Sequence, residues 1–513
     1  MRLLALCVAN SARSQMAEGW LRALSIPDVE VYSAGSAPTR PRPEAVAVMR
    51  EVGIDLAAHR SKSVREVPAP DVAITLCAEE VCPLYPGEVE RLSWPIDDPA
   101  NARGSWEERL AAFRVARDAI RVHVEAFLRE RRLRMVFGAE VRDLFALRQD
   151  VTFLNHGSFG ATPRMVLEAQ RRLIDELESQ PLAFMRSVPV RIRRVAARVA
   201  SFLRADPQDV VFVDNASTGV TAVLRSLSLR EGDVLFTTDH AYGAVRRALD
   251  RVAARTGARV VAAPVPFPIG SPREVIDAVE RTMPDDTKLA VFDGITSITG
   301  LVFPVEALVG LCRARGIPVL IDAAHVPGHL PVDLGALEAD YWVGNCHKWL
   351  FAPKGCAVLH VRRDRHEQLD PVVFSHGVGT GLSSAFDWLG TRDPSPWLAM
   401  DAALDFVDQF GADRIRAHNV LLRESEAELL CGRFGLTPPA PSSMLGALQT
   451  LPVPFPTDGT QATADAINRH LWETHRVEVM FAPFRGRVWM RIAAQIYNRP
   501  EDYERLGDLL LTR

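Results

Sequence analysis

The sequence lacks any long uninterrupted hydrophobic run, although 48% of its residues are hydrophobic. No stretch reaches the ~18 apolar residues needed to cross a bilayer. Residues 3–8 (LLALCV) form an apolar segment too short for a signal peptide, and polar residues follow it at once. We therefore expect a cytoplasmic protein with no membrane partner.

An excess of one charge and a cysteine framework are also missing. Lysine and arginine total 60 and aspartate and glutamate total 64, which gives a formal net charge of -4 and no electrostatic reason to expect nucleic acid as a partner. The seven cysteines show no framework spacing, so a reducing compartment is indicated and a disulfide is expected to be catalytic rather than structural. Internal repeats are absent, and no residues are assigned to a metal ion.

What the chain does have is 513 residues in which apolar runs alternate with helical patterns. This predicts α/β architecture with mostly parallel sheets, in more than one domain. Helices are expected from near Ser14 and over 106–131, and a boundary near 133 separates domains 1–133 and 134–513, with a smaller C-terminal subdomain from about 400. The expected strands are 3–8, 29–35, 71–77, 210–215, 233–239, 259–265, 288–294, 318–324, 356–361 and 487–493.

A cysteine–arginine motif, CVANSARS, joins the first expected strand to the first expected helix. Backbone N–H groups in such a loop converge on an anion, and the helix start adds partial positive charge. Arg13 is able to bind two oxygens of a tetrahedral oxyanion. The same field favours the thiolate form of Cys7, with the Ser14 hydroxyl as a further donor to the sulfur. Asp98, held in place by Pro99, is the expected general acid for the leaving oxygen.

Residues 1–133 resemble the low-molecular-weight protein-tyrosine phosphatase family, and most of all its thioredoxin-coupled arsenate reductase branch. The matching segments are SARSQMAEGW (11–20), VYSAGS (31–36), GIDLAAHRSKS (53–63), TLC (75–77) and CP (82–83). The resemblance implies a small parallel-sheet domain in which Cys7 attacks an oxyanion, arsenate or a phosphate ester, that Asn10 and Ser14 help to bind. It also implies that Cys77 and Cys82 relay a disulfide outward to thioredoxin.

Two alternatives remain open for this domain. One is a phosphatase acting on protein tyrosine or small aryl phosphates, which has no need of Cys77 and Cys82. The other is a module that binds phosphate without turnover. Ala9, which stands where the family usually has glycine, leaves room for the second alternative.

A second motif pairs a strand-terminal aspartate with a lysine. Asp322 ends the apolar run in PVLIDAAHVPG (318–328), and Lys348 lies 26 residues later in GNCHKWLFAPKG (344–355). A pyridoxal phosphate enzyme needs a lysine for the Schiff base and a carboxylate that keeps the pyridine nitrogen protonated. Burial beside other cations favours the neutral amine.

Further segments supply the other groups that this cofactor and an amino acid require. In VDNASTGV (213–220), the start of an expected helix with Ser217 and Thr218 suits a phosphate dianion. Tyr242 supplies a ring for stacking on the pyridine face. Arg491 is expected to grip a substrate carboxylate through two hydrogen bonds.

Residues from about 135 to 513 resemble the fold-type I, class V pyridoxal enzymes, most closely the isopenicillin N epimerase-like group. The matching motifs are LNHGSFGATP (154–163), DAAH (322–325), HKW (347–349) and GTRDPS (390–395). The resemblance implies a large, mainly parallel sheet domain with a smaller α/β subdomain. Lys348 is then the Schiff-base lysine and Asp322 the pyridinium partner.

The same resemblance assigns the remaining residues. His325 hydrogen-bonds the phenolic oxygen of the cofactor, with Ser297 as a second candidate, and Asn345 and His347 join Ser217 and Thr218 at the phosphate. Asn155 and His156 line the substrate pocket. Thr391 reaches the phosphate bound to a neighbouring subunit, which implies a homodimer.

The class includes desulfurases, C–S lyases, transaminases and epimerases that act on amino acids. Related desulfurases carry a persulfide-forming cysteine shortly before the carboxylate-binding arginine, but residues 477–491 contain none. Cys431 lies about sixty residues upstream and is expected to be a core thiol. We therefore expect Lys348 to take the Cα proton and a sulfur leaving group to depart, with epimerisation and transamination as alternatives.

Overall fold

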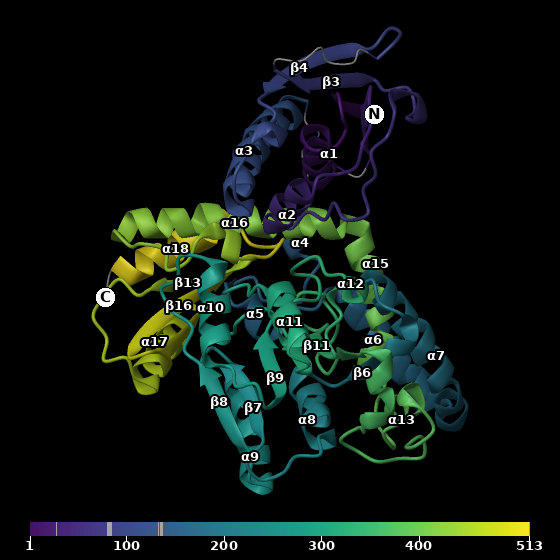
Figure 1. Ribbon diagram of the computed structural model, residues 1–513, viewed down its shortest axis with the longest axis vertical. Helices are drawn as coiled ribbons and strands as arrows, with labels where there is room; N and C mark the ends of the chain where they lie inside the picture. Colours follow the sequence, from purple (N-terminus) through teal and green to yellow (C-terminus); the bar gives the residue numbers. More distant parts are fainter. Residues whose placement is uncertain (27, 79–84, 132, 134–136, 512–513) are drawn as a thin grey trace. The chain divides into compact units, whose positions relative to one another are not determined.

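The computed structural model describes residues 1–26, 28–78, 85–131, 133 and 137–511 (Figure 1). The chain forms two compact units. Unit 1 comprises Met1–Glu140 with Phe410–Leu421, and unit 2 comprises Val141–Gln409 with Leu422–Arg513. Among the described residues, no helix combines the length and the apolar character needed to cross a membrane. The domain boundary expected near 133 falls among residues outside the description.

Unit 1 is built on a four-stranded sheet in the order β2-β1-β3-β4, with every neighbouring pair parallel. Parallel neighbours require crossover connections, and helices supply most of them. The strands are β1 (Arg2–Cys7), β2 (Glu30–Gly35), β3 (Val72–Cys77) and β4 (Glu90–Ile96). The helices are α1 (Arg13–Leu24), α2 (Pro43–Glu51) and α3 (Trp106–Glu130), followed by the short α4 (Ala139–Arg142).

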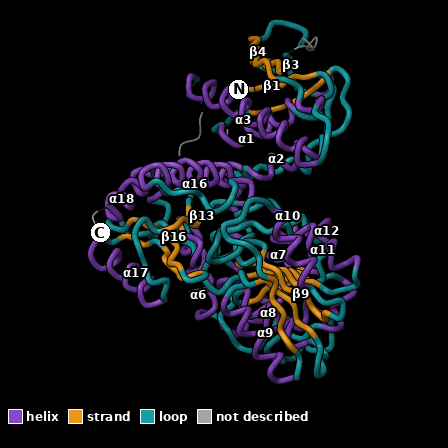
Figure 2. The backbone as a smooth tube through the Cα atoms, turned by 60° about the vertical axis from the view of Figure 1, so that its left-hand side comes forward, coloured by secondary structure: helices purple, strands orange, loops and turns teal. Residues whose placement is uncertain are grey.

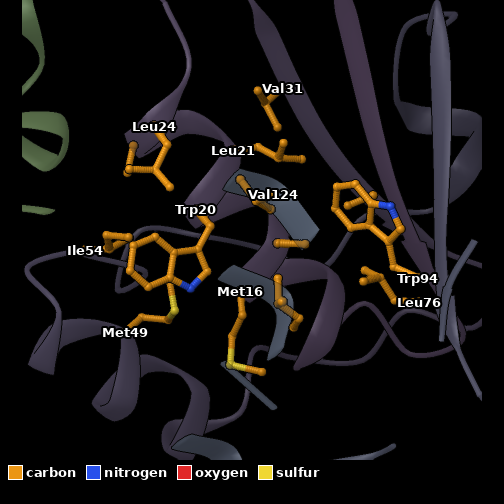
Figure 3. Close-up of a cluster of buried hydrophobic side chains, with 14 of the residues drawn as sticks. Met16, Trp20, Leu21, Leu24, Val31, Met49, Ile54, Leu76, Trp94 and Val124 are labelled. Atoms are coloured by element: carbon orange, nitrogen blue, oxygen red, sulfur yellow. The ribbon is translucent and has the colours of Figure 1, made fainter. Parts of the chain in front are cut away.

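The core of unit 1 lies between the sheet and its helices. Figure 3 shows Trp20 of α1 close to Met49 of α2 and to Ile54, with Val124 of α3 nearby. All four side chains are at most 1% exposed. Burying a side chain of this size contributes about 1.5–3 kcal/mol, so this cluster fixes α1, and with it the loop that precedes α1, against the sheet.

Unit 2 contains a seven-stranded sheet in the order β6-β12-β11-β10-β9-β7-β8. Its pairs are parallel except those of β12, which runs antiparallel to both of its neighbours. Figure 2 shows these strands gathered side by side among helices that include α8, α9 and α11. The strands are β6 (Val210–Val213), β7 (Val234–Thr238), β8 (Arg259–Ala263), β9 (Thr287–Asp293), β10 (Val319–Asp322), β11 (Tyr341–Asn345) and β12 (Ala357–Val361).

Helices surround this sheet in the order that the chain supplies them. They are α5 (His156–Phe159), α6 (Arg164–Ser179), α7 (Pro181–Phe202), α8 (Ala216–Ser226), α9 (Gly243–Thr256), α10 (Pro272–Thr282), α11 (Val305–Ala314), α12 (Leu334–Leu337), α13 (Leu382–Asp387), α14 (Ser395–Leu398) and α15 (Met400–Phe410). Helix α8 packs its apolar face on β11 and β12. Because parallel strands end at the same edge of a sheet, side chains that follow β9, β10 and β11 come together there.

The rest of unit 2 forms a smaller subdomain around the antiparallel sheet β13-β16-β15. It contains β13 (Leu448–Pro452), β15 (Met480–Phe484), β16 (Arg487–Ala493), α17 (Gln461–His475) and α18 (Pro500–Leu511). Helix α16 (Ala412–Phe434) contributes residues to both units. The subdomain also includes β5 (Thr152–Phe153), which pairs with β14 (Val477–Glu478), so its residues are not confined to the C-terminal part of the chain.

The predicted fold class, α/β with mostly parallel sheets, is confirmed. Two strands were not predicted. β4 contains Pro95 and is mostly exposed, because it forms an edge of the sheet where a missing N–H costs no ladder bond. β11 ends in Gly344 and Asn345, which the sequence analysis placed in a polar loop.

Candidate active sites

The first candidate site lies where β1 ends. β1 has β2 on one side and β3 on the other, so the chain leaves it at the switch point of the sheet, where open parallel sheets bind ligands. Cys7, the last residue of β1, is 3% exposed. Helix α1 begins at Arg13, and its N-cap residue, Ala12, makes no side-chain cap. A helix start of this kind favours an anion beside it.

Ser14 connects Cys7 to a buried hydrogen-bond network. The Ser14 Oγ lies 2.9 Å from Cys7 Sγ and 2.8 Å from Asn10 Nδ2. Because an amide nitrogen only donates, Ser14 Oγ accepts from Asn10 and is left with its own proton to donate to the sulfur. This arrangement suits a thiolate at Cys7, as the sequence analysis expected.

Asn10 holds the backbone of the loop. It has φ 46°, in the left-handed region that asparagine tolerates better than most residues. Its Oδ1 accepts from the backbone N–H of Lys62 at 2.7 Å, and its Nδ2 donates to Ser33 Oγ at 2.9 Å. Ala9 is not among the residues with positive φ, so the backbone of the loop does not require glycine at that position. The side chain of Asn10 therefore supports the loop rather than facing a ligand alone.

Close packing on β2 also shapes this loop. A Cβ at Gly35 would lie 2.4 Å from the carbonyl oxygen of Val8 and 2.9 Å from the backbone nitrogen of Asn10. Only glycine lets the loop approach β2 this closely. The sequence analysis used this segment for the family resemblance but did not identify the steric reason for the glycine.

Arg13 and Asp98 are brought together as expected. Arg13 Nη2 donates to Asp98 Oδ2 at 2.9 Å, and Nη1 donates to the carbonyl oxygen of Ile96 at 2.9 Å. Asp98 also caps the turn that follows it, since its Oδ1 accepts from the N–H of Ala100 at 3.0 Å. The acid and the arginine thus lie at the same edge of the sheet as Cys7.

Cys77 ends β3, the strand beside β1, and is disulfide-bonded. Since neighbouring parallel strands end at one edge, Cys77 and Cys7 belong to the same edge of the sheet. Cys82 lies outside the described residues. Its predicted role in a relay remains a prediction.

The second candidate site is a cavity of about 460 Å³ in unit 2, at the edge where β9, β10 and β11 end. Eight of the residues that the sequence analysis selected line it: Ser217, Tyr242, Ser297, Asp322, His325, Asn345, His347 and Lys348. They come from five separate stretches of the chain, so the fold brings together what the sequence separates.

Lys348 is the only one of these residues with an amine, and its surroundings favour the neutral form. Burial lowers its pKa to about 7, helped by the charge of Arg491 and opposed by Asp322. Its Nζ lies 3.2 Å from His325 Nε2. A neutral amine at physiological pH is able to act as a nucleophile or as a base.

His325 has a defined tautomer in this geometry. Trp349 Nε1, which only donates, lies 3.4 Å from His325 Nδ1. Burial holds the pKa of His325 well below its ordinary value, with a further contribution from Lys348. The neutral ring therefore carries its proton on Nε2, which points to Lys348 and is available as a donor in the cavity.

Asp322 ends β10 and is 3% exposed. Burial raises its pKa above the ordinary value, against the N–H of Ala324, which donates to Oδ1 at 3.1 Å, and against the charge of Lys348. A buried carboxyl without an ion-pair partner in the described chain is best satisfied by a cation entering the cavity.

The start of α8 forms the part of the cavity expected to hold a phosphate. Asn215 caps this helix by accepting from the N–H of Thr218 at 3.0 Å, and Ser217 lines the cavity. Asn345 Oδ1 accepts from the N–H of Ala216 at 2.8 Å and so holds its amide against the helix start. Thr218 is not among the lining residues.

His347 lies beside this helix start with one nitrogen already engaged. Its Nδ1 donates to the carbonyl oxygen of Cys356 at 3.1 Å. Burial lowers the pKa of His347 to about 4, so the neutral ring presents Nε2 without a proton.

Arg491, on β16, is buried with an unsatisfied group. Its two Nη atoms contact the carbonyl oxygen of Ser297, the amide of Asn155 and the hydroxyl of Ser158. Its Nε has no hydrogen-bond partner within the described chain. Burial lowers the pKa of this guanidinium to about 10, which leaves it charged at neutral pH. Asn155 thus touches the arginine directly.

His156 supports the lysine from below rather than lining the cavity. It is 0% exposed, and its Nε2 lies 3.0 Å from the carbonyl oxygen of Lys348 while its Nδ1 lies 2.8 Å from Tyr497 Oη. Gly160 packs on the same loop: it has φ +71°, and a Cβ there would lie 2.3 Å from the carbonyl oxygen of His347. The segment from His156 to Gly160 therefore positions the loop that carries Lys348.

Thr391 is exposed and does not line the cavity. Its predicted contact is with another subunit, so a single chain leaves that prediction open.

Comparison with known proteins identifies the family of unit 2. Residues 162–441 match the family model described as aminotransferase class-V. The isopenicillin N epimerase of Streptomyces clavuligerus is 32% identical over 391 residues, covering 72% of this chain and 97% of that protein. An L-cysteine desulfhydrase of Arabidopsis thaliana is 30% identical over 396 residues, covering 70% and 87%. The chain belongs to the class V aminotransferase family.

Solved structures agree with the class V fold. The cystine C-S lyase C-DES, in complex with its reaction product cysteine persulfide, has a TM-score of 0.62 at 21% identity, over 71% of this chain and 97% of that one. A cysteine desulfurase from Thermococcus onnurineus NA1 has a TM-score of 0.61 at 19% identity, over 73% and 98%. At these identities the likeness shows the fold.

Unit 1 has a family of its own. Residues 2–135 match the model of low molecular weight phosphotyrosine protein phosphatases. The protein therefore joins a phosphatase-type domain to a class V domain, and both resemblances stated from the sequence are confirmed.

The cofactor of the class V domain is pyridoxal phosphate, and the cavity fits it. A helix start with exposed donors suits the phosphate, the buried carboxyl of Asp322 suits a cationic ring nitrogen, and the neutral amine of Lys348 suits an aldehyde. The sequence analysis missed one buried acid in this cavity, Asp293. Its signal was present, because Asp293 ends the apolar run KLAVFD as Asp322 ends PVLID.

Proposed function

We propose that the class V domain is a C–S lyase that removes a sulfur leaving group from a cysteine-derived amino acid. The observation that carries this proposal is the Lys348 amine, neutral near pH 7, in a cavity lined by no cysteine among the described residues. Cys431 is 6% exposed in the hydrophobic core of the small subdomain. Without a thiol to accept sulfur, the sulfur leaves as a free product.

Pyridoxal phosphate, when bound, supplies an electron sink that acidifies the Cα–H bond of the amino acid. Arg491 binds the substrate carboxylate and fixes Cα near Lys348. The Lys348 amine takes the Cα proton, after which the Cβ–S bond breaks with its electron pair leaving on sulfur. The donor on His325 Nε2, or the hydroxyl of Ser297, serves the phenolic oxygen, and Asp322 stabilises positive charge at the ring nitrogen.

The phosphate is held by Ser217, Thr218, Asn345 and His347, and Tyr242 stacks on the ring. We further propose a homodimer in which Thr391 reaches the phosphate of the neighbouring subunit. A Thr391→Ala variant is then expected to remain dimeric and to lose cofactor during gel filtration, as measured by absorbance. Retention of the cofactor at wild-type level would remove Thr391 from the site.

The reaction is tested with the purified full-length protein and a panel of sulfur amino acids in deuterated water. A lyase releases sulfide or thiol together with pyruvate and ammonium in equal amounts. Deuterium at Cα with inversion and no released sulfur identifies an epimerase. Formation of pyridoxamine phosphate and a keto acid that keeps its sulfur identifies a transaminase.

We also propose that the phosphatase-type domain, residues 1–133, is a thiolate-dependent arsenate reductase. The hydrogen bond from Ser14 to Cys7 Sγ supports a nucleophilic sulfur. Cys7 attacks arsenic, and Asp98 protonates the leaving oxygen while Arg13 neutralises the oxyanion. Cys77 and Cys82 then supply two electrons: two thiols become a disulfide, arsenate becomes arsenite, and thioredoxin reduces the disulfide.

Paired assays separate this activity from its alternatives. Thioredoxin-dependent arsenate reduction is expected to vanish in Cys7→Ser and in Cys77→Ser or Cys82→Ser. Aryl phosphate hydrolysis that is lost in Cys7→Ser but survives the other two changes identifies a phosphatase. Arsenate or phosphate binding with neither turnover identifies a binding module.

A further inference from the structure

Asp293 is a buried acid in the cofactor cavity that no step above uses. It ends β9 as Asp322 ends β10, and the two residues are register partners in the parallel pairing of these strands. Register partners on neighbouring parallel strands project to the same face of the sheet. Both aspartates line the cavity, and they are 4% and 3% exposed.

The two carboxyl groups have little to balance two charges. Neither forms an ion pair with any residue in the described ranges. The backbone N–H of Tyr242 donates to Asp293. Two carboxylates side by side in a site of low dielectric repel strongly, so one of them holds a proton. Burial and the charge of Asp322 both raise the pKa of Asp293 well above its ordinary value.

The other titratable groups around Asp293 do not replace this pairing. Strand β7, on the far side of β9, leads to Asp239, which is already paired with Arg485. Among the buried residues of α11, only Cys312 titrates, and burial raises its pKa to about 12. The titratable groups that share the cavity are Asp214, Tyr242, Asp322, His325, His347, Lys348 and Lys354.

We infer that Asp293 is a positioning residue whose protonated carboxyl donates a hydrogen bond to the Asp322 carboxylate, so that the pair presents one negative charge to the ring nitrogen of pyridoxal phosphate. This inference rests on the proposed role of Asp322. The hydroxyl of Asp293 occupies one side of that carboxylate and leaves the other side for the cofactor. Asp293 acts through Asp322 and needs no contact with substrate.

Two substitutions in the full-length protein test the hydrogen bond. Asp293→Asn keeps a donor of similar shape, whereas Asp293→Ala removes it. Because a hydrogen bond to a charged group contributes about a factor of ten or more in binding, we expect the dissociation constant of pyridoxal phosphate to rise about tenfold in Asp293→Ala. In Asp293→Asn it stays within about threefold of wild type. Absorbance titration measures both, and equal losses in the two variants would overturn the inference.

The pH dependence of stability tests the proton itself. Asp293 is ionised in the unfolded chain above about pH 4 and protonated in the folded one, so wild-type stability falls as pH rises from there toward the raised folded pKa. Asparagine does not titrate. The unfolding temperature of the Asp293→Asn holoprotein, relative to wild type, is therefore expected to increase with pH. A difference that stays constant with pH contradicts a protonated Asp293.

Asp322→Asn separates this inference from the proposed function. If Asp322→Asn leaves cofactor affinity and the absorbance spectrum unchanged, the proposed role of Asp322 fails. If Asp322→Asn weakens binding while Asp293→Ala does not, the role of Asp322 stands and only the inference about Asp293 is wrong.

Discussion

Cys7 and Lys348, the two proposed nucleophiles, must each lose a proton before they act, and their surroundings favour that loss in opposite ways. Around Cys7 the protein supplies donors: the Ser14 hydroxyl, a helix start and the Arg13 guanidinium. Around Lys348 it supplies burial and another cation, Arg491. A thiol becomes negative when it ionises and needs donors, whereas an ammonium becomes neutral and needs a site that tolerates charge poorly.

The comparison predicts different sensitivities to substitution. Polar neighbours should matter most at Cys7, because each contributes one hydrogen bond to a charge. At Lys348 the dominant factor is the buried position, which no single neighbour supplies. The predictions that follow test this contrast.

Loss of the amine at position 348 should have the largest effect. Lys348→Ala removes the group proposed to take the Cα proton, and we expect kcat for sulfur release to fall by about 10³-fold or more. Exchange of the Cα proton with deuterated solvent, measured by NMR, should stop as well. Lys288→Ala, at a half-exposed lysine of β9 paired with Asp233, is the control and should match wild type. Continued Cα exchange in Lys348→Ala would assign the base to another residue.

The donor to Cys7 should come next. Ser14→Ala removes the hydroxyl that lies 2.9 Å from the sulfur, and we expect the alkylation rate of Cys7 by iodoacetamide at neutral pH to fall about tenfold. Ser61→Ala, which removes a hydroxyl bonded to the Asn10 carbonyl oxygen instead, is the matched control. Equal effects of the two changes would mean that the loop, and not the donor, governs the reactivity of Cys7.

A shift in pH dependence should be smaller but more specific. The pKa of Lys348 lies at about 7, and only the neutral amine attacks an aldehyde, so the reconstitution rate of the apoprotein with pyridoxal phosphate should rise with pH through about 7. Because Arg491 helps to lower this pKa, Arg491→Gln should move the inflection upward. Arg485→Gln, outside the cavity, should leave it in place. An inflection that is the same in all three proteins would assign the lowered pKa to burial alone.

The two sites were also predictable from the sequence to different extents. Cys7, Arg13 and Lys348 stand out because strand ends and motifs mark them, and the parallel fold then gathers the strand ends at one edge. Asp293 escaped because it stands alone at the end of a strand without a motif. The buried position of His156 beneath Lys348 escaped because its partners, Tyr497 and Gln495, lie more than 330 residues away in the chain.

Cys431 should have the smallest effect, and that small effect sharpens the contrast between the two thiol chemistries of the chain. Its side chain is 6% exposed among the apolar residues of the small subdomain, and burial raises its pKa. A neutral thiol in a core is a poor sulfur acceptor, so Cys431→Ala should leave kcat for sulfur release within about twofold while lowering stability by about 1 kcal/mol. Mass spectrometry of the protein after turnover should find no persulfide at this residue. A persulfide there, together with loss of turnover, would make the class V domain a sulfur-transfer enzyme and give both units a catalytic cysteine.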